Sequence, residues 1–193
     1  MIRPAIPEDA GEAIPLLFSA VGDIAYSLAG TNDREEAMRI LTGFFRQRGN
    51  RISFENVVVS ERDGQIAGIV VAYDGGRADE LDAPLVTHAR ALTGRDDYTI
   101  AKETRPGEYY LDSIAVNDAF QGQGIGKSLM RAFEEKGGAE GHSRLALIVE
   151  EDNDRAYALY RKMGYREDGR LTVGGSSYRR MVKSIRAEES EYT

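Results

Sequence analysis

The stretch Gln121–Met130, QGQGIGKSLM, constrains this chain more than any other. It places glycine at positions 122, 124 and 126, directly before an apolar pattern of helical spacing. Each glycine costs conformational entropy on folding, so a turn alone explains one or two of them but not three at alternate positions. Glycines arranged in this way let backbone N–H groups at a helix N-terminus converge on an anion. The stretch therefore predicts an anion-binding loop followed by a helix.

Two well-known phosphate loops do not fit this stretch. A Walker A loop requires glycine five residues before Gly126, where Gln121 stands, and residues 117–120 separate the loop from the strand before it. A dinucleotide fingerprint that begins at Gly122 requires glycine where Lys127 stands. The later stretch LALIVEED imitates a Walker B strand, so a P-loop NTPase remains a distant alternative.

The remaining pattern predicts an α/β (α+β) fold with a mixed sheet flanked by helices. Strands are expected at 1–6, 52–60, 65–73, 108–116, 145–149, 165–172 and 177–185, with Asp63-Gly64 turning the second into the third. Helices are expected from Pro7 with a kink at Pro15, from Asn32 to Gly49, from the glycine loop to Gly137-Gly138, and from Asn153 to Gly164. Residues 74–107 are expected to form a long connection with a short helix at about 85–92. Residues 1–186 should form one domain and 187–193 a frayed tail.

Composition narrows the class of protein. The net charge of −7 disfavours a nucleic-acid partner, and the longest apolar run, 66–73, is too short to span a bilayer. The N-terminal residues lack the apolar core of a signal peptide, and the chain has no cysteine. Two isolated histidines, His88 and His142, do not suggest a metal site. We expect a cytoplasmic protein with no membrane partner and no metal.

Two motifs in order give a family resemblance. The segment LDSIAVNDAFQGQGIGKSLM resembles motif A of the GNAT superfamily of N-acetyltransferases, whose [QR]-x-x-G-x-[GA] signature is filled by Gln121, Gly124 and Gly126. The segment NDRAYALYRKMGY, residues 153–165, is similar to motif B of the same superfamily. The resemblance covers about residues 109–165 and implies a GNAT-type, mostly antiparallel sheet. It also implies acetyl-CoA as the co-substrate, with its pyrophosphate on the glycine loop.

The resemblance also implies which residues bind acetyl-CoA. The glycine loop and the end of the preceding strand are expected to bind acetyl-CoA through their backbone groups. Lys127 and Lys162 could instead be ordinary solvated lysines, and Asn153 could be an ordinary helix N-cap. The full set comprises Ile114, Ala115, Val116, Gln121, Gly122, Gln123, Gly124, Ile125, Gly126, Lys127, Ser128, Asn153, Tyr160 and Lys162.

Catalytic candidates follow from the same resemblance. Tyr160 matches a common proton donor to the leaving thiolate, although its helical spacing also suits a core residue. Asp112 and Glu108 are candidate bases, and alternation along the strand would place both on one face with Tyr110 and Ile114. Solvation at a sheet edge, or hydrogen bonds to nearby loops, would explain either acid equally well.

The implied reaction is direct acetyl transfer to a primary amine of a small molecule or peptide. A CoA-binding regulatory module without efficient transfer is the alternative, and a homodimer is possible. Residues 74–108 carry more acidic than basic side chains, which predicts a neutral or cationic acceptor.

Overall fold

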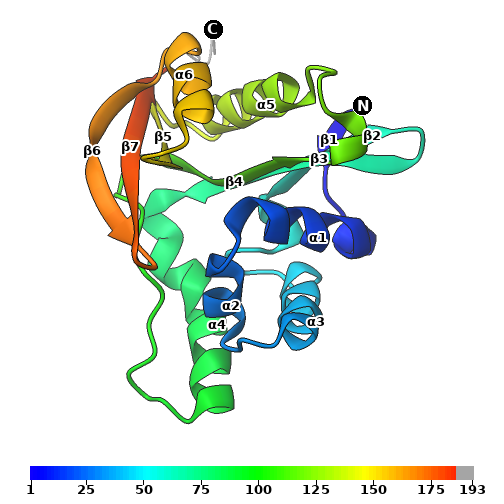
Figure 1. The fold of residues 1–193 in the computed structure, drawn as a ribbon, viewed down its shortest axis with the longest axis vertical. Coiled ribbons are helices and arrows are strands. Elements are labelled where there is room, and N and C mark those ends of the chain that lie inside the picture. Colours follow the sequence, from blue (N-terminus) through cyan, green and yellow to red (C-terminus); the bar gives the residue numbers. More distant parts are fainter. Residues whose placement is uncertain (186–193) are drawn as a thin grey trace, which may run out of the picture.

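The computed structural model describes residues 1–185, which form one seven-stranded mixed sheet flanked by helices. Its spatial order is β1-β2-β3-β4-β5-β7-β6 (Figure 1). Neighbouring strands are antiparallel except for β4 and β5, which are parallel. The strands are β1 (Ile2–Pro4), β2 (Val57–Arg62), β3 (Gln65–Asp74), β4 (Tyr109–Val116), β5 (Arg144–Glu150), β6 (Arg166–Val173) and β7 (Ser176–Ser184).

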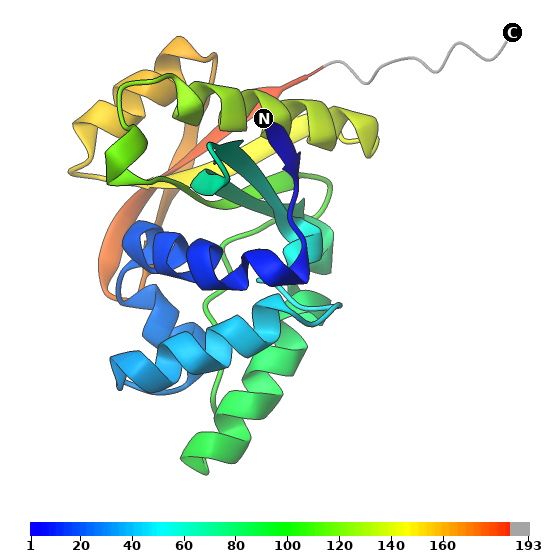
Figure 2. The same ribbon diagram turned by 90° about the vertical axis from the view of Figure 1, so that its right-hand side faces the viewer.

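Helices cover both faces of the sheet, as Figures 1 and 2 show. On one face lie α5 (Ile125–Ala139) and α6 (Asp154–Lys162). The other face carries α1 (Ala10–Val21) and α2 (Ile24–Ala29), with α3 (Arg34–Phe45) and α4 (Ala78–Thr93) packed beyond them. Each face has its own apolar core, because alternate side chains of β3 and β4 point to opposite sides. None of the helices in residues 1–185 is both long enough and apolar enough to cross a membrane.

The predicted fold class is confirmed, and several predicted boundaries are wrong. Residues 54–56 form a short 3-10 turn capped by Ser53, so β2 begins at Val57 rather than at 52. The α3 helix is capped by the Asp33 side chain, which accepts from the backbone N–H of Glu36, and not by Asn32. Pro15 lies inside a continuous α1, on its exposed side, where water can hydrogen-bond the carbonyl group left without a partner.

The connection 74–107 differs most from its prediction. It contains a 16-residue helix, α4, whose buried side chains recur at Leu81, Leu85 and Ala89. The pair Gly137-Gly138 lies within α5, because Gly137 lets the helix approach Tyr109 and Leu145. The predicted tail, 187–193, falls outside the described residues.

Candidate active site

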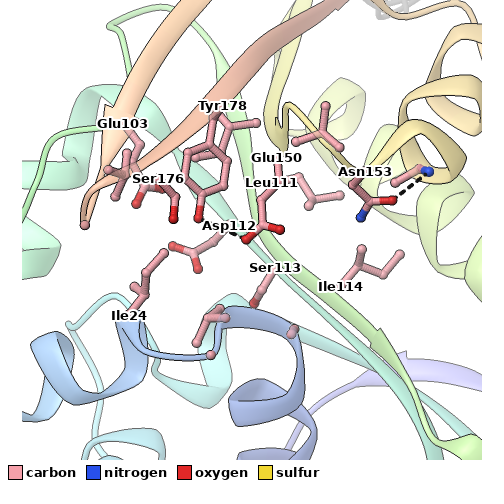
Figure 3. Close-up of a pocket in the computed structure, with 18 of the residues that line it drawn as sticks. Ile24, Glu103, Leu111, Asp112, Ser113, Ile114, Glu150, Asn153, Ser176 and Tyr178 are labelled. Carbon is pink, nitrogen blue, oxygen red and sulfur yellow. Dashed lines mark hydrogen bonds between the residues drawn. The ribbon is translucent and has the colours of Figure 1, made fainter. Parts of the chain in front are cut away.

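A cavity of about 570 Å³ opens where β4 and β5 separate. The two strands pair only at Tyr109–Leu145 and Tyr110–Ala146, and the residues beyond these pairs border the cavity. The corner between α1 and α2, the start of α6 and the turn between β6 and β7 complete its walls (Figure 3). Four predicted site residues line this one cavity: Asp112, Ile114, Asn153 and Tyr160.

A β-bulge in β4 changes which side chains share a face. Val71 of β3 pairs with Ser113, but the next residue, Ala72, pairs with Leu111, so Asp112 is the extra residue. Asp112 consequently points to the face that carries Tyr73, whereas Ile114 packs into the core beneath α5. The predicted common face for Asp112 and Ile114 is wrong, because alternation is broken by one residue at the bulge.

Asp112 is held by two donors on the face of the sheet that carries α1 and α2. Its carboxylate accepts from Arg51 Nε at 2.6 Å and from the Tyr73 hydroxyl at 2.7 Å, and its side chain is 2% exposed. An acid that is to take a proton from a substrate needs a free oxygen within reach of it. Both donors contact Oδ2, so Oδ1 is the oxygen that remains, and the ion pair with Arg51 holds this carboxylate in the buried cluster.

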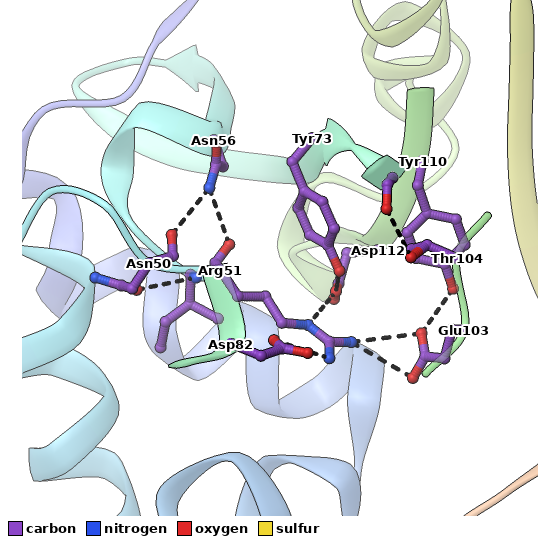
Figure 4. Close-up of polar contacts among 11 residues, drawn as sticks. Asn50, Arg51, Asn56, Tyr73, Asp82, Glu103, Thr104, Tyr110 and Asp112 are labelled. Atoms are coloured by element: carbon purple, nitrogen blue, oxygen red, sulfur yellow. Dashed lines mark hydrogen bonds and ion pairs between the residues drawn. The ribbon is translucent and has the colours of Figure 1, made fainter. Parts of the chain in front are cut away.

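Arg51 lies at the centre of a buried polar cluster, shown in Figure 4. Besides Asp112, its guanidinium is 3.4 Å from Glu103 and 3.6 Å from Asp82. Burial raises the pKa of Asp82 to about 6 and also raises that of Glu103, which accepts from the Tyr110 hydroxyl. Three carboxyl groups thus surround one guanidinium beside the cavity.

Glu108 lies outside the cavity. It precedes β4, is 1% exposed, and forms an ion pair with Arg180 of β7. It also accepts from the backbone N–H of Arg105 at 2.8 Å. This placement makes Glu108 a structural tie between the start of β4 and β7, and it gives no support to the prediction that Glu108 is a base.

The glycine loop turns the chain from β4 into α5. Gly122 and Gly124 have φ of +76° and +77°, and a Cβ added at either would meet nothing within 4 Å. Gly124 is the N-cap of α5, and no side chain caps the first N–H groups of the helix. The loop therefore needs glycine for its left-handed backbone, and it leaves its surface open.

The other loop residues divide into packing and exposed positions. The Gln121 side chain donates to Asp118 at 2.8 Å, and the Ser128 hydroxyl donates to the Gly124 carbonyl at 3.2 Å. Ile125 is buried in the core, whereas Lys127 is exposed in the first turn of α5. Backbone groups and the exposed side chains of Gln123 and Lys127 thus face outward here for a ligand.

The remaining predicted residues lie on β4 and α6. Ala115 is buried in the core below the sheet, and Val116 packs against α5. Asn153 caps α6, since its Oδ1 accepts from the Ala156 N–H at 3.1 Å, and Lys162 is exposed on the same helix. Tyr160 is 8% exposed and packs edge-on against Tyr165, and burial raises the pKa of Tyr160 above its ordinary value.

The sequence did not predict several cavity residues, among them Arg51, Glu150 and Tyr178. Glu150 ends β5 and Tyr178 stands opposite it on β7, and both line the cavity. The acids at the end of LALIVEED are the one local signal for Glu150, and they also resemble the end of a Walker B strand. Nothing local to Tyr178 indicates that it faces the same cavity.

Known structures place this architecture among acetyltransferases. A crystal structure described as an acetyltransferase aligns over 96% of this chain and 100% of its own, with a TM-score of 0.81 and 30% identity. An N-acetyltransferase from Staphylococcus aureus Mu50 aligns over 95% and 100%, with a TM-score of 0.73 and 20% identity, which supports the fold alone. The fold and the cavity thus define an acetyltransferase-like α/β protein.

The family follows from the sequence. Residues 26–165 match the Acetyltransferase (GNAT) family, and the chain belongs to this family. N-alpha-acetyltransferase RimI of Mycobacterium tuberculosis is 41% identical over 68 residues, which are 34% of this chain and 40% of RimI. Uncharacterized protein ML0378 of Mycobacterium leprae is 35% identical over 107 residues, which are 55% of this chain. The chain therefore spans 40% and 26% of the lengths of these two curated relatives.

Proposed function

We propose that the protein is an acetyl-CoA-dependent N-acetyltransferase that acts on a neutral or cationic primary amine of a small molecule or peptide. One observation carries the proposal. Asn153 and Tyr160 of α6 meet the open edge of β4 in one cavity, as the motif resemblance requires. These parts together fit direct attack of an amine on the thioester, which needs positioning and proton transfer but no covalent enzyme intermediate.

The glycine loop fits the pyrophosphate of acetyl-CoA. Gly122 and Gly124 leave the approach to the first N–H groups of α5 clear of side chains. The helix dipole favours a negative ligand there by about 0.3–1 kcal/mol, and exposed Lys127 adds a positive charge. Exposed Lys162 on α6 suits the 3′-phosphate of the same co-substrate.

The open edge of β4 fits the pantetheine arm. Beyond Tyr110, the backbone of β4 is not paired with β5, so residues 114–116 can hydrogen-bond an extended ligand as an added strand would. A backbone N–H here would polarise the thioester carbonyl, and Asn153 Nδ2 is free of its capping role. When bound, acetyl-CoA supplies the activated acetyl group.

The charge of the cavity supports a neutral or cationic acceptor. Among residues 1–185, its wall includes the carboxyl groups of Asp23, Glu103, Asp112 and Glu150, but only one cationic side chain, Arg51. Arg51 is itself bound to Glu103 and Asp112. An anionic acceptor would meet repulsion from the remaining carboxylates.

Thermal unfolding and thiol release test the proposal together. Acetyl-CoA should raise the Tm, whereas ATP with magnesium should not do so comparably. Free thiol should then appear from acetyl-CoA with some member of a panel of polyamines, small neutral amines and peptide N-termini. A strong Tm shift with ATP and none with acetyl-CoA would overturn the proposal. Faster acetylation of aspartate than of every polyamine would overturn the preference for neutral or cationic acceptors.

A glycine pair provides a matched control. Gly124→Val should abolish the acetyl-CoA shift, because valine at a φ of +77° forces the loop to change its backbone. Gly141 has a φ of +85° and equally open surroundings, but it follows α5 at its far end. Gly141→Val should carry a similar strain and keep the acetyl-CoA shift. Equal losses in both variants would show that strain alone, and not the loop site, was measured.

A further inference from the structure

The cavity wall contains two carboxylates outside the Arg51 cluster, and one of them, Glu150, lies on the strand that leads into α6. Asp112 and Glu103 are both bound to Arg51, and Glu108 lies elsewhere. Glu150 forms no ion pair with any of residues 1–185, and it lines the cavity at the end of β5. Asp23, at the corner of α1 and α2, is the other carboxylate of the wall outside the Arg51 cluster, on the opposite side of the cavity.

Glu150 has a partner that directs it into the cavity. Its neighbour across the sheet is Tyr178 of β7, whose hydroxyl donates to Glu150 Oε1 at 3.5 Å, a long hydrogen bond. Figure 3 shows the two side chains pointing toward each other within the cavity. Burial, followed by the charge of Glu150, raises the pKa of Tyr178, so its hydroxyl keeps the proton that it donates.

Glu150 and Tyr160 approach the gap between β4 and β5 from opposite faces of the sheet. Leu147 and Val149 point to the core beneath α5 that also contains Tyr160. Glu150 follows Val149, so alternation turns it to the other face, where α1 and α2 lie. An acceptor entering beside α1 and α2 would meet Glu150, while the thiolate would leave on the side of Tyr160.

We propose that Glu150 is the base that removes a proton from the acceptor nitrogen, and that Tyr178 is a positioning residue for it. This inference rests on the proposed acetyltransferase function. The amine nitrogen forms a bond to the acetyl carbon as the carbon–sulfur bond breaks. The proton leaves nitrogen for the Glu150 carboxylate, and the Tyr160 hydroxyl gives a proton to the departing sulfur. Exchange with solvent then restores both side chains.

Glu150→Gln tests the base directly. The amide keeps the size of the side chain and removes its proton-accepting oxygen, so kcat should fall roughly 10²- to 10³-fold. The KM for acetyl-CoA and the Tm should stay close to wild type, because the residue is exposed and lies away from the glycine loop. Activity lost in this way should recover partly at high pH, where more of the acceptor is already neutral.

Two control variants separate a base from general charge. Glu151 is the next residue and forms an ion pair with Arg170, outside this cavity, so Glu151→Gln should retain wild-type kcat. Asp23→Asn removes a charge from the opposite wall, so it should raise the KM of a cationic acceptor without the recovery at high pH. Tyr178→Phe should lower kcat about tenfold with an unchanged KM for acetyl-CoA, because Glu150 loses its orienting donor.

The outcomes distinguish the two proposals. If the wild-type protein releases no thiol from acetyl-CoA with any amine of the panel, the proposed function itself is overturned. Turnover by the wild-type protein together with undiminished kcat in Glu150→Gln would leave that function intact and overturn the base. A loss in Asp23→Asn equal in size and pH dependence to that in Glu150→Gln would also overturn it, because both would then act through charge alone.

Discussion

At the scale of single residues, Tyr160 has two competing roles: its hydroxyl donates a proton to the leaving thiolate, or its ring serves only in packing. Burial raises its pKa above the ordinary value, so the hydroxyl loses its proton only when the pH rises through that raised pKa, above about 10. Tyr160→Phe keeps the ring against Tyr165 and removes only the hydroxyl. We expect kcat to fall roughly 10²-fold by a constant factor across neutral pH, with acetyl-CoA binding and the Tm retained.

Tyr157→Phe is the control on the same helix. The Tyr157 ring lies under the Arg179 guanidinium at 4.4 Å, a contact that phenylalanine preserves, so its kcat should match wild type. If Tyr160→Phe turns over at the wild-type rate, Tyr160 is a packing residue. If Tyr160→Phe loses stability as well as activity, the hydroxyl has a structural role and the acid is another group.

At the scale of elements, α5 shows how one glycine sets the distance between a helix and the sheet. A Cβ on Gly137 would come within 2.8 Å of both Leu145 and Tyr109, whereas one on Gly138 would meet only Ile185 at 3.6 Å. Gly138→Ala should therefore stabilise the protein by about 0.5–1 kcal/mol through helix propensity. Gly137→Ala should destabilise it, since overpacking costs about 1–3 kcal/mol and exceeds that gain.

Urea unfolding of the two variants measures this difference, and each glycine serves as the control for the other. Their helical positions are adjacent, so intrinsic propensity is nearly equal and packing is what differs. Equal stabilisation by both substitutions would show that α5 can move away from β4 and β5 at little cost. The position of the glycine loop, at the start of the same helix, would then be less firmly fixed than the packing suggests.

At the scale of the whole molecule, the Arg51 cluster ties separate parts of the chain together. Asp82 comes from α4, Glu103 from the segment after it, and Asp112 from β4. Burial raises the pKa of Asp82 to about 6, so between about pH 4 and 6 the folded state holds a proton that the unfolded state has released. Its stabilising contribution is complete at the lower end of this window and is lost as the pH rises through about 6.

Asp82→Asn should remove this dependence. The free energy of unfolding of the variant, minus that of the wild type, should increase by roughly 2 kcal/mol between pH 4 and 7. Denaturant unfolding at several pH values in that window measures it. Asp79→Asn is the control on the same helix, because Asp79 is 82% exposed and forms an exposed ion pair with Lys102. Its difference from wild type should stay nearly flat. A flat difference for Asp82→Asn would show that Asp82 is ionised throughout.

The sequence by itself determined those parts of the site that are local in the chain. The glycine loop, the α6 helix with its Asn153 cap and the strand before each are set by residues a few positions apart, so spacing was enough to predict them.

Tertiary structure decided the rest. Asp112 turns away from Ile114 because β3 opposes β4 with one residue fewer, and its Arg51 partner is 61 residues distant. Glu150 meets Tyr178 only because β7, and not the next strand in the chain, lies beside β5. Which strands become neighbours depends on packing across the whole sheet, and no short stretch of sequence contains that information.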